Sequence, residues 1–249
     1  MYKQSVSHWP ISGLSDEQFK KVLAIGITGV EMPPPDSYQK FRDLGFTIAT
    51  IAGHNSLADG LNKTENHSRI ADELRANLEV AKQFEIPNLI CFSGNRAGKS
   101  EEEGAANCAA GLQMVAKDAE AAGVNLIMEL LNSKVDHGDY QCDRTPWGVE
   151  VVEQVNSPRV KLLYDIYHMQ IMEGDLIRTI RDNIQHIAHF HTAGNPGRND
   201  LDENQEIFYP AVARAIAATG YDGWLGHEFG PKADSLAALQ QAYDQCSVK

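Results

Sequence analysis

The chain has 249 residues, a length that an α/β barrel commonly uses for one domain. Hydrophobic residues make up 43% and charged residues 22%, an ordinary balance that excludes a disordered chain. With 22 Lys and Arg against 34 Asp and Glu, the net charge of −12 disfavours binding to nucleic acid and to anionic membranes.

The cysteine pattern and the first residues bear on the cellular compartment. Cys91, Cys108, Cys142 and Cys246 are scattered, which predicts free thiols rather than a zinc ribbon or a disulfide framework. The first ten residues lack the apolar core of a signal peptide, and no apolar run reaches the ~18 residues of a membrane helix. We therefore expect a cytoplasmic protein, while a leader peptide removed from a longer precursor would leave no trace here.

Short apolar runs alternate with segments of helical periodicity along the whole chain. Strands are expected at residues 3–9, 29–32, 46–52, 88–92, 125–131, 160–166, 187–190 and 223–229. Helices are expected at residues 14–25, 36–44, 67–84, 101–122, 147–155, 175–184, 208–219 and 233–243. The first helix begins after the N-cap residue Ser15, and the third presents Leu74 on its apolar face.

Eight strand–helix units of this kind predict the α/β fold class, as a (β/α)8 TIM barrel that forms one domain over residues 1–249. Residues 125–128 and 160–164 are apolar on both faces, as parallel strands covered by helices must be. The rival fold is a doubly wound open sheet. It usually has a glycine-rich phosphate turn after its first strand, and His8-Trp9-Pro10 is not such a turn.

Residues of metal-ligand type stand at the ends of four consecutive strands: Glu129, Asp165, His191 and Glu228. Active sites of such barrels lie at the carboxyl ends of the strands. One acid in an apolar run is as often a buried ion-pair partner, but three carboxylates at one mouth cannot all stay ionised without a cation. Three oxygen ligands and one imidazole suit Mn²⁺, Mg²⁺ or Co²⁺, and Zn²⁺ is also compatible.

The histidine ligand has rivals nearby. Strand alternation places His189 and His191 on one face, and His191 lies nearer the strand end. His189 is expected one layer deeper or in a hydrogen bond to a ligand. Alternation does not decide between His227 and Glu228 on the last strand.

Three segments resemble the hydroxypyruvate isomerase family, within the xylose isomerase-like TIM barrel superfamily. They are residues 164–170 (Tyr-Asp-Ile-Tyr-His-Met-Gln), 172–176 (Met-Glu-Gly-Asp-Leu) and 223–229 (Gly-Trp-Leu-Gly-His-Glu-Phe). The resemblance covers residues 129–231 and is weaker in the first half, where His54-Asn55 is similar to a His-Asn pair of the family. The superfamily also contains ketose 3-epimerases, inosose dehydratases and endonuclease IV-type repair enzymes.

The resemblance implies metal ligation by Glu129, Asp165, His191 and Glu228, and substrate contacts from His54, His168 and Arg198. It implies an intramolecular oxidoreductase that converts hydroxypyruvate to tartronate semialdehyde. A chelated divalent metal stabilises an enediolate while Glu129 and Glu228, the expected catalytic residues, move the proton. Arg198 is the best cation for a substrate carboxylate. Dimers or tetramers are the family habit, so a homo-oligomer is compatible with this reading.

The chain departs from the family pattern in three places. The residue after Glu129 is Leu130 where the family has proline, and the ligand on the seventh strand is His191, as in sugar epimerases, where the family often has glutamine. An acidic stretch, residues 199–206, replaces a glycine-rich loop and is expected to touch the substrate. These departures leave the metal site intact and the substrate open.

Three other functions compete with the isomerase. A ketose 3-epimerase or another sugar isomerase would use the same residues, and a dehydratase would differ only in losing a leaving group. An endonuclease needs a basic groove, against which the net charge of −12 argues. A non-catalytic binding barrel would tolerate loss of a metal ligand, whereas all four positions are filled.

Overall fold

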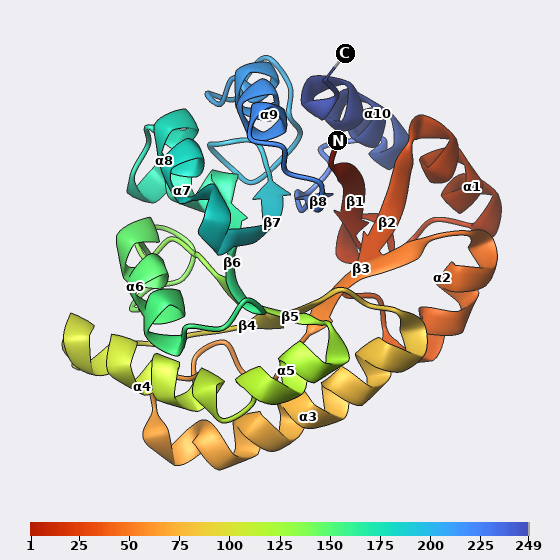
Figure 1. Ribbon diagram of the computed structural model, residues 1–249. Helices are drawn as coiled ribbons and strands as arrows, with labels where there is room; N and C mark the ends of the chain where they lie inside the picture. Colours follow the sequence, from red (N-terminus) through yellow and green to blue (C-terminus); the bar gives the residue numbers. More distant parts are fainter. Residues whose placement is uncertain (249) are drawn as a thin grey trace.

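The structure is a computed structural model that describes residues 1–248. Its centre is a closed barrel of parallel strands, each paired with the next and the last paired with the first (Figure 1). The strands are β1 Lys3–Ser7, β2 Ile27–Glu31, β3 Thr47–Ala52, β4 Asn88–Cys91, β5 Asn125–Glu129, β6 Val160–Asp165, β7 Ile187–Thr192 and β8 Trp224–His227. The predicted (β/α)8 TIM barrel is confirmed, because the rival doubly wound sheet would be open.

Helices surround the barrel on its outer face (Figure 1). They are α1 Asp16–Ile25, α2 Tyr38–Leu44, α3 His67–Phe84, α4 Glu101–Gln113, α5 Ala116–Ala122, α6 Thr145–Val155, α7 Ile166–Met172, α8 Leu176–Asn183, α9 Tyr209–Ala218 and α10 Ser235–Cys246. Short 3-10 turns occupy Trp9–Ile11, Pro35–Ser37, Thr64–Asn66 and Ile184–His186. Within residues 1–248, no helix combines the length and the apolar composition that crossing a membrane requires.

Local sequence signals set the bounds of α1. The Ser15 side chain accepts a hydrogen bond from the Gln18 amide, and the Gln18 side chain bonds back to the Ser15 backbone. This reciprocal cap satisfies two amides that the first turn leaves without partners. Gly26 ends the helix with a φ of 112°, a conformation that glycine adopts without strain. The Ser15 cap that the sequence predicts is therefore confirmed.

The prediction of one continuous helix over residues 101–122 is wrong. The segment breaks into α4 and α5 at Val115, whose φ of −125° and ψ of −2° lie outside the helical region. The break frees the Met114 carbonyl, which accepts a hydrogen bond of 2.8 Å from Arg75 of α3. Helical periodicity continues across this break, so the pattern alone did not reveal it.

A helix that the sequence analysis did not predict follows β6. The strand ends at Asp165, and the Asp165 carboxylate accepts a hydrogen bond of 3.0 Å from the His168 amide. Asp165 is thus the N-cap of α7, and the expected strand over residues 160–166 is one residue too long. The cap holds His168 on the first turn of a helix at the carboxyl end of the barrel.

The barrel interior is divided into an apolar and a polar half. Ile90, Ile127 and Leu163, from β4, β5 and β6, form a buried apolar cluster. On the other side, Glu31 of β2 is bonded to His189 of β7. Since β2 and β7 are not neighbouring strands, this bond crosses the interior. The polar half therefore holds a charged group deep within the barrel.

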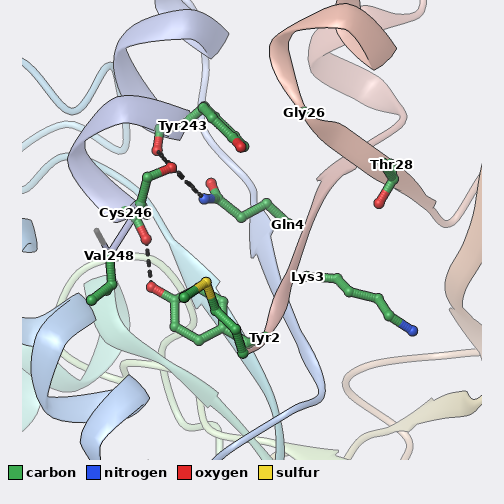
Figure 2. Close-up of a pocket in the computed structure, with 10 residues that line it drawn as sticks. Tyr2, Lys3, Gln4, Gly26, Thr28, Tyr243, Cys246 and Val248 are labelled. Atoms are coloured by element: carbon green, nitrogen blue, oxygen red, sulfur yellow. Dashed lines mark hydrogen bonds between the residues drawn. The ribbon is translucent and has the colours of Figure 1, made fainter.

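A pocket of about 230 Å³ lies at the amino-terminal end of the barrel, between the start of β1 and the end of α10 (Figure 2). Tyr2 donates a hydrogen bond of 2.5 Å to the Cys246 carbonyl, and Gln4 donates one of 3.2 Å to the Ser247 hydroxyl. These bonds join the first strand to the last helix. Residues at this end of a barrel contribute to its stability, whereas active sites of such barrels lie at the opposite end.

Helix α3 gives a direct test of the packing. Leu74 is fully buried, and its side chain fills the space beside Gly53 at the end of β3. We expect Leu74→Ala to lower the free energy of unfolding by about 2–5 kcal/mol, because it leaves a cavity that the barrel cannot close. Urea denaturation measures this loss. The control Glu79→Ala, at an exposed position of the same helix, should change stability by less than about 0.5 kcal/mol.

Candidate metal centre and active site

The four residues predicted as metal ligands come together at the carboxyl end of the barrel. Glu129 ends β5, Asp165 ends β6, His191 lies near the end of β7, and Glu228 follows β8 directly. One ligand atom from each lies within 4.8 Å of the others, and all four residues are buried. The structure therefore forms the cluster that the strand ends predict.

The geometry separates Glu228 from His227, a choice that strand alternation left open. Both ring nitrogens of His227 are engaged, one with the Thr192 hydroxyl and one with the Gln4 side chain, each at 2.8 Å. Burial lowers the pKa of His227 to about 3, so its ring is neutral. Glu228, not His227, joins the cluster.

The imidazole of His191 is aimed by a carboxylate behind it. Its Nε2 lies 2.8 Å from a Glu31 oxygen, and its Nδ1 faces Glu228 at 3.2 Å and Glu129 at 3.4 Å. Burial alone would raise the pKa of Glu31, but His189 and His191 hold it well below its usual range. Ionised Glu31 only accepts hydrogen bonds, so Nε2 carries the proton toward it.

The buried Nδ1 of His191 has no hydrogen-bond partner, although carboxylate oxygens surround it. Burial lowers the pKa of His191, but Glu31 and Glu228 raise it well above its usual value. A proton or a metal ion can occupy the position that Nδ1 faces, and metal binding releases that proton. This atom is the first evidence that the residues fit a divalent metal.

The carboxylates give the second evidence. Burial raises the pKa of both Glu129 and Asp165, and the charge of Glu228 raises them further. Burial alone would raise the pKa of Glu228, but His191 and Arg198 lower it to about 2. A divalent cation among these groups would remove the repulsion between them. Three oxygens and one nitrogen suit Mn²⁺, Mg²⁺ or Co²⁺.

Glu31 is a component of the site that the sequence analysis missed. It is fully buried and bonded by His189 at 3.0 Å, by Thr50 at 3.2 Å and by Ser5. Gly226 leaves room for it, since a Cβ at that position would overlap the carboxylate. The signal that could have found Glu31 is its position, because it ends β2 as Glu129 ends β5 and Asp165 ends β6.

His168 is held in one tautomer by Asn132. The Asn132 carbonyl oxygen accepts the amides of Val135 and Asp136 at 2.9 Å, so its NH₂ group faces His168 Nδ1 at 2.6 Å. Because Asn132 donates there, His168 Nδ1 accepts and Nε2 carries the hydrogen. That Nε2 is buried without a partner, 3.8 Å from Asp165. A hydrogen-bond donor thus points into the site.

Arg198, which is predicted to contact the substrate, lies beside the cluster. Its guanidinium bonds Glu228 at 2.7 Å and lies 5.9 Å from the Tyr167 ring centre. Its buried Nε has no partner. The Arg198 carbonyl accepts a hydrogen bond of 2.8 Å from the Gly230 amide. This bond ties the loop after β7, which carries Arg198, to the residues after β8.

The acidic loop bonds mainly to other parts of the protein. Asp200 accepts the Lys232 amide at 3.0 Å, Asp202 pairs with the Lys232 side chain at 2.7 Å, and Glu206 bonds Asn195 at 2.6 Å. These carboxylates stabilise the loop around Arg198. The expected substrate contact from residues 199–206 stays a prediction.

His54 is buried at the end of β3, and both of its ring nitrogens contact backbone. Nε2 accepts the Phe92 amide at 2.9 Å, and Nδ1 lies 3.1 Å from the Asn55 carbonyl. These bonds join the loops that follow β3 and β4. The predicted contact of His54 with substrate stays a prediction, and only its ring carbons are free to make it.

The role of Glu31 can be tested by metal binding. We expect Glu31→Gln to weaken Mn²⁺ affinity by about 10–100-fold, because the neutral amide no longer holds His191 Nδ1 ready to bind. Isothermal titration with Mn²⁺ measures the change. Glu73→Gln, in α3, removes a carboxylate away from the site and should leave the affinity unchanged. Equal affinity in the Glu31 variant and the wild type would show that Glu31 serves only the fold.

Comparisons with known proteins agree with the fold. The model of the family described as "Xylose isomerase-like TIM barrel" matches residues 19–246. The chain is 26% identical to hydroxypyruvate isomerase of Escherichia coli over 239 residues, 90% of each protein. It is 34% identical to 2-oxo-tetronate isomerase of Cupriavidus necator over 128 residues, which cover 51% of this chain and about half, 48%, of that protein.

Solved structures of low sequence identity share the fold. A structure of L-ribulose 3-epimerase superposes with a TM-score of 0.81 at 20% identity, covering 98% of this chain and 93% of that one. A structure described as AP endonuclease, family 2, from Brucella melitensis superposes with a TM-score of 0.82 at 22% identity, covering 96% and 97%. At these identities the likeness concerns the fold alone.

Proposed function

Because this chain belongs to the xylose isomerase-like TIM barrel family, we propose that it is a metal-dependent isomerase of a small hydroxy-carbonyl compound, with hydroxypyruvate as the substrate and tartronate semialdehyde as the product. The enzyme class predicted from the sequence, an isomerase, is the class named for relatives that align along nine-tenths of the chain. The observation that carries the proposal is the meeting of Glu129, Asp165, His191 and Glu228 at the barrel mouth.

The reaction moves one proton between neighbouring carbons. Glu129, Asp165, His191 and Glu228 would hold a divalent metal, which would supply positive charge to stabilise negative charge on the substrate oxygens. Glu129 and Glu228 flank the reacting carbons, and one of them takes the proton from C3 of hydroxypyruvate. The same carboxylate or its partner returns a proton to C2, and the proton of the C3 hydroxyl passes to the C2 oxygen, so that C3 becomes the aldehyde carbon and C2 carries a hydroxyl.

Other residues orient the substrate. His168 donates from Nε2 to a substrate oxygen, and Asn132 keeps the proton on that nitrogen. Arg198 bonds Glu228 and offers its free Nε to a substrate carboxylate. His54 contributes a ring face from the opposite side. Burial of the site limits the water that could quench the intermediate charge.

A ketose 3-epimerase is the second candidate. The histidine at position 191 is the ligand type of sugar epimerases, and an epimerase would use the same carboxylates to return the proton to the opposite face of the same carbon. A dehydratase would expel a leaving group instead. A repair endonuclease is disfavoured by the net charge of −12, and a non-catalytic barrel by the filled ligand set.

The proposal extends to partners and compartment. We infer a small hydroxy-carbonyl or sugar as the ligand, with no role for nucleic acid or a membrane surface, and a cytoplasmic location. The buried thiols of the four cysteines, which form no disulfide, are consistent with a reducing compartment. A homo-oligomer fits the family habit.

Proton transfer can be followed by deuterium incorporation. In D₂O, the manganese-loaded protein should convert hydroxypyruvate to tartronate semialdehyde labelled at C2, as NMR detects. We expect Glu129→Gln to lower kcat by about 10²–10⁴-fold, because the amide cannot accept a proton. Metal content measured on the same samples separates loss of the base from loss of metal. Unchanged turnover in a metal-loaded Glu129→Gln variant would exclude Glu129 as the base.

The carboxylate contact can be tested through Arg198. We expect Arg198→Ala to raise KM for hydroxypyruvate by about 10–100-fold, because a charged hydrogen bond to the carboxylate is lost. KM for a neutral ketose should rise much less. A matched rise for acid and ketose would mean that Arg198 acts on the loop or on Glu228 rather than on the substrate carboxylate.

A further inference from the structure

A third nitrogen without a partner lies near the two already assigned to the substrate. The buried Nε2 of His137 has no hydrogen-bond partner, as is true of His168 Nε2 and Arg198 Nε. His137 comes from the connection between β5 and α6, a segment in which the sequence analysis placed no site residue. A buried polar atom without a partner costs stability unless a ligand or water satisfies it.

Contacts bring these three side chains into one group, which we call the nitrogen cluster (His137, His168 and Arg198). The ring centres of His137 and His168 lie 5.2 Å apart. Tyr167 lies between His168 and Arg198, with its ring centre 5.0 Å from that of His168 and 5.9 Å from the Arg198 guanidinium carbon. The cluster therefore runs from the loop after β5, across α7, to the loop after β7.

His137 lies near enough to the metal-type ligands for their charges to act on its ring. Burial and the charge of Arg198 lower the pKa of His137, while Asp136, Asp165 and Glu228 raise it. Asp165 and Glu228 belong to the four-residue cluster at the barrel mouth. The His137 ring therefore lies within the electrostatic field of the candidate active site.

The loop that carries His137 is held by the residue that orients His168. The backbone amide of His137 donates to the backbone carbonyl of Asn132 at 3.1 Å. The side-chain oxygen of Asn132 accepts the backbone amides of Val135 and Asp136. The His137 carbonyl accepts the Tyr140 amide at 3.0 Å. Asn132 thus orients the imidazole of His168 and anchors the backbone of His137, which contributes to the preorganisation that a binding subsite requires.

We propose that His137 is a specificity residue that binds the carboxylate of the substrate together with His168 and Arg198. This inference rests on the proposed function, in which the substrate is a hydroxy-carbonyl acid. His168 and Arg198 offer donors only. In its Nε2–H tautomer, His137 adds a third donor to the cluster. A carboxylate has only acceptors and matches such a cluster.

A neutral ketose matches the cluster less well. Its terminal hydroxyl must donate a hydrogen as well as accept one. The adjacent acceptor, Asp136, already receives hydrogen bonds from Asn132 at 2.7 Å and from Tyr167 at 2.9 Å on one oxygen. The cluster therefore selects acids over sugars of the same length.

The test compares two probes that share the HOCH₂–CO unit, hydroxypyruvate and dihydroxyacetone. Their affinities for the manganese-loaded protein are measured by calorimetric titration, and deuterium exchange by NMR. We expect His137→Ala to weaken hydroxypyruvate binding by at least about tenfold and dihydroxyacetone binding by less than about twofold. His137→Gln keeps an N–H donor and should recover most of the loss.

The control and the contrary outcomes separate the two proposals. His186→Ala removes a histidine paired with Glu153, just before β7, and should behave as wild type. Equal weakening for both probes, no weakening in His137→Ala, or no binding of hydroxypyruvate by the wild type would overturn the carboxylate subsite. Binding that depends on His137 without deuterium exchange would sustain the subsite and refute the isomerase reaction. Deuterium exchange that is unchanged in His137→Ala would support the isomerase reaction and refute the subsite.

Discussion

The hydrogen bond between His191 and the buried carboxylate of Glu31 is the interaction on which the site depends. It crosses the barrel interior from β7 to β2 and fixes which nitrogen of His191 faces the carboxylates at the mouth. Burying a carboxylate without partners would cost several kcal/mol. Here four hydrogen bonds to Glu31 offset that cost. The polar half of the interior is therefore a support for the metal-type cluster above it.

Hydrogen bonds also orient side chains at the mouth of the barrel, where Asn132 and Asp165 position residues of the site. The side-chain oxygen of Asn132 accepts the backbone amides that form a turn, and its NH₂ group sets the tautomer of His168. Asp165 caps α7 with one oxygen and leaves the other toward His191. Each side chain thus joins a backbone function to a site function, which keeps the reacting groups on rigid elements.

Chemistry and specificity reside in different parts of the molecule. The metal-type ligands stand at or next to strand ends, where the barrel fixes their separation. In the nitrogen cluster, His137 and Arg198 stand on connections between elements, and His168 stands on the first turn of α7. Proteins similar to this chain are named for hydroxypyruvate and 2-oxo-tetronate, and a structure that shares its fold is named for L-ribulose. In a barrel of this kind the loops can vary while the strand ends keep their places, which is a physical basis for a range of substrates.

The sequence by itself determined the barrel and the four residues that meet at its mouth, because strand period and strand ends are local features that repeat along the chain. Through resemblance it also predicted a substrate contact from Arg198, which lies beside the cluster. Only the tertiary structure revealed Glu31 and His137, because their partners lie 160 and about 30 residues away along the chain. The tautomers of His168 and His191 likewise depend on hydrogen bonds that form when distant segments meet. Periodicity carries no information on such contacts.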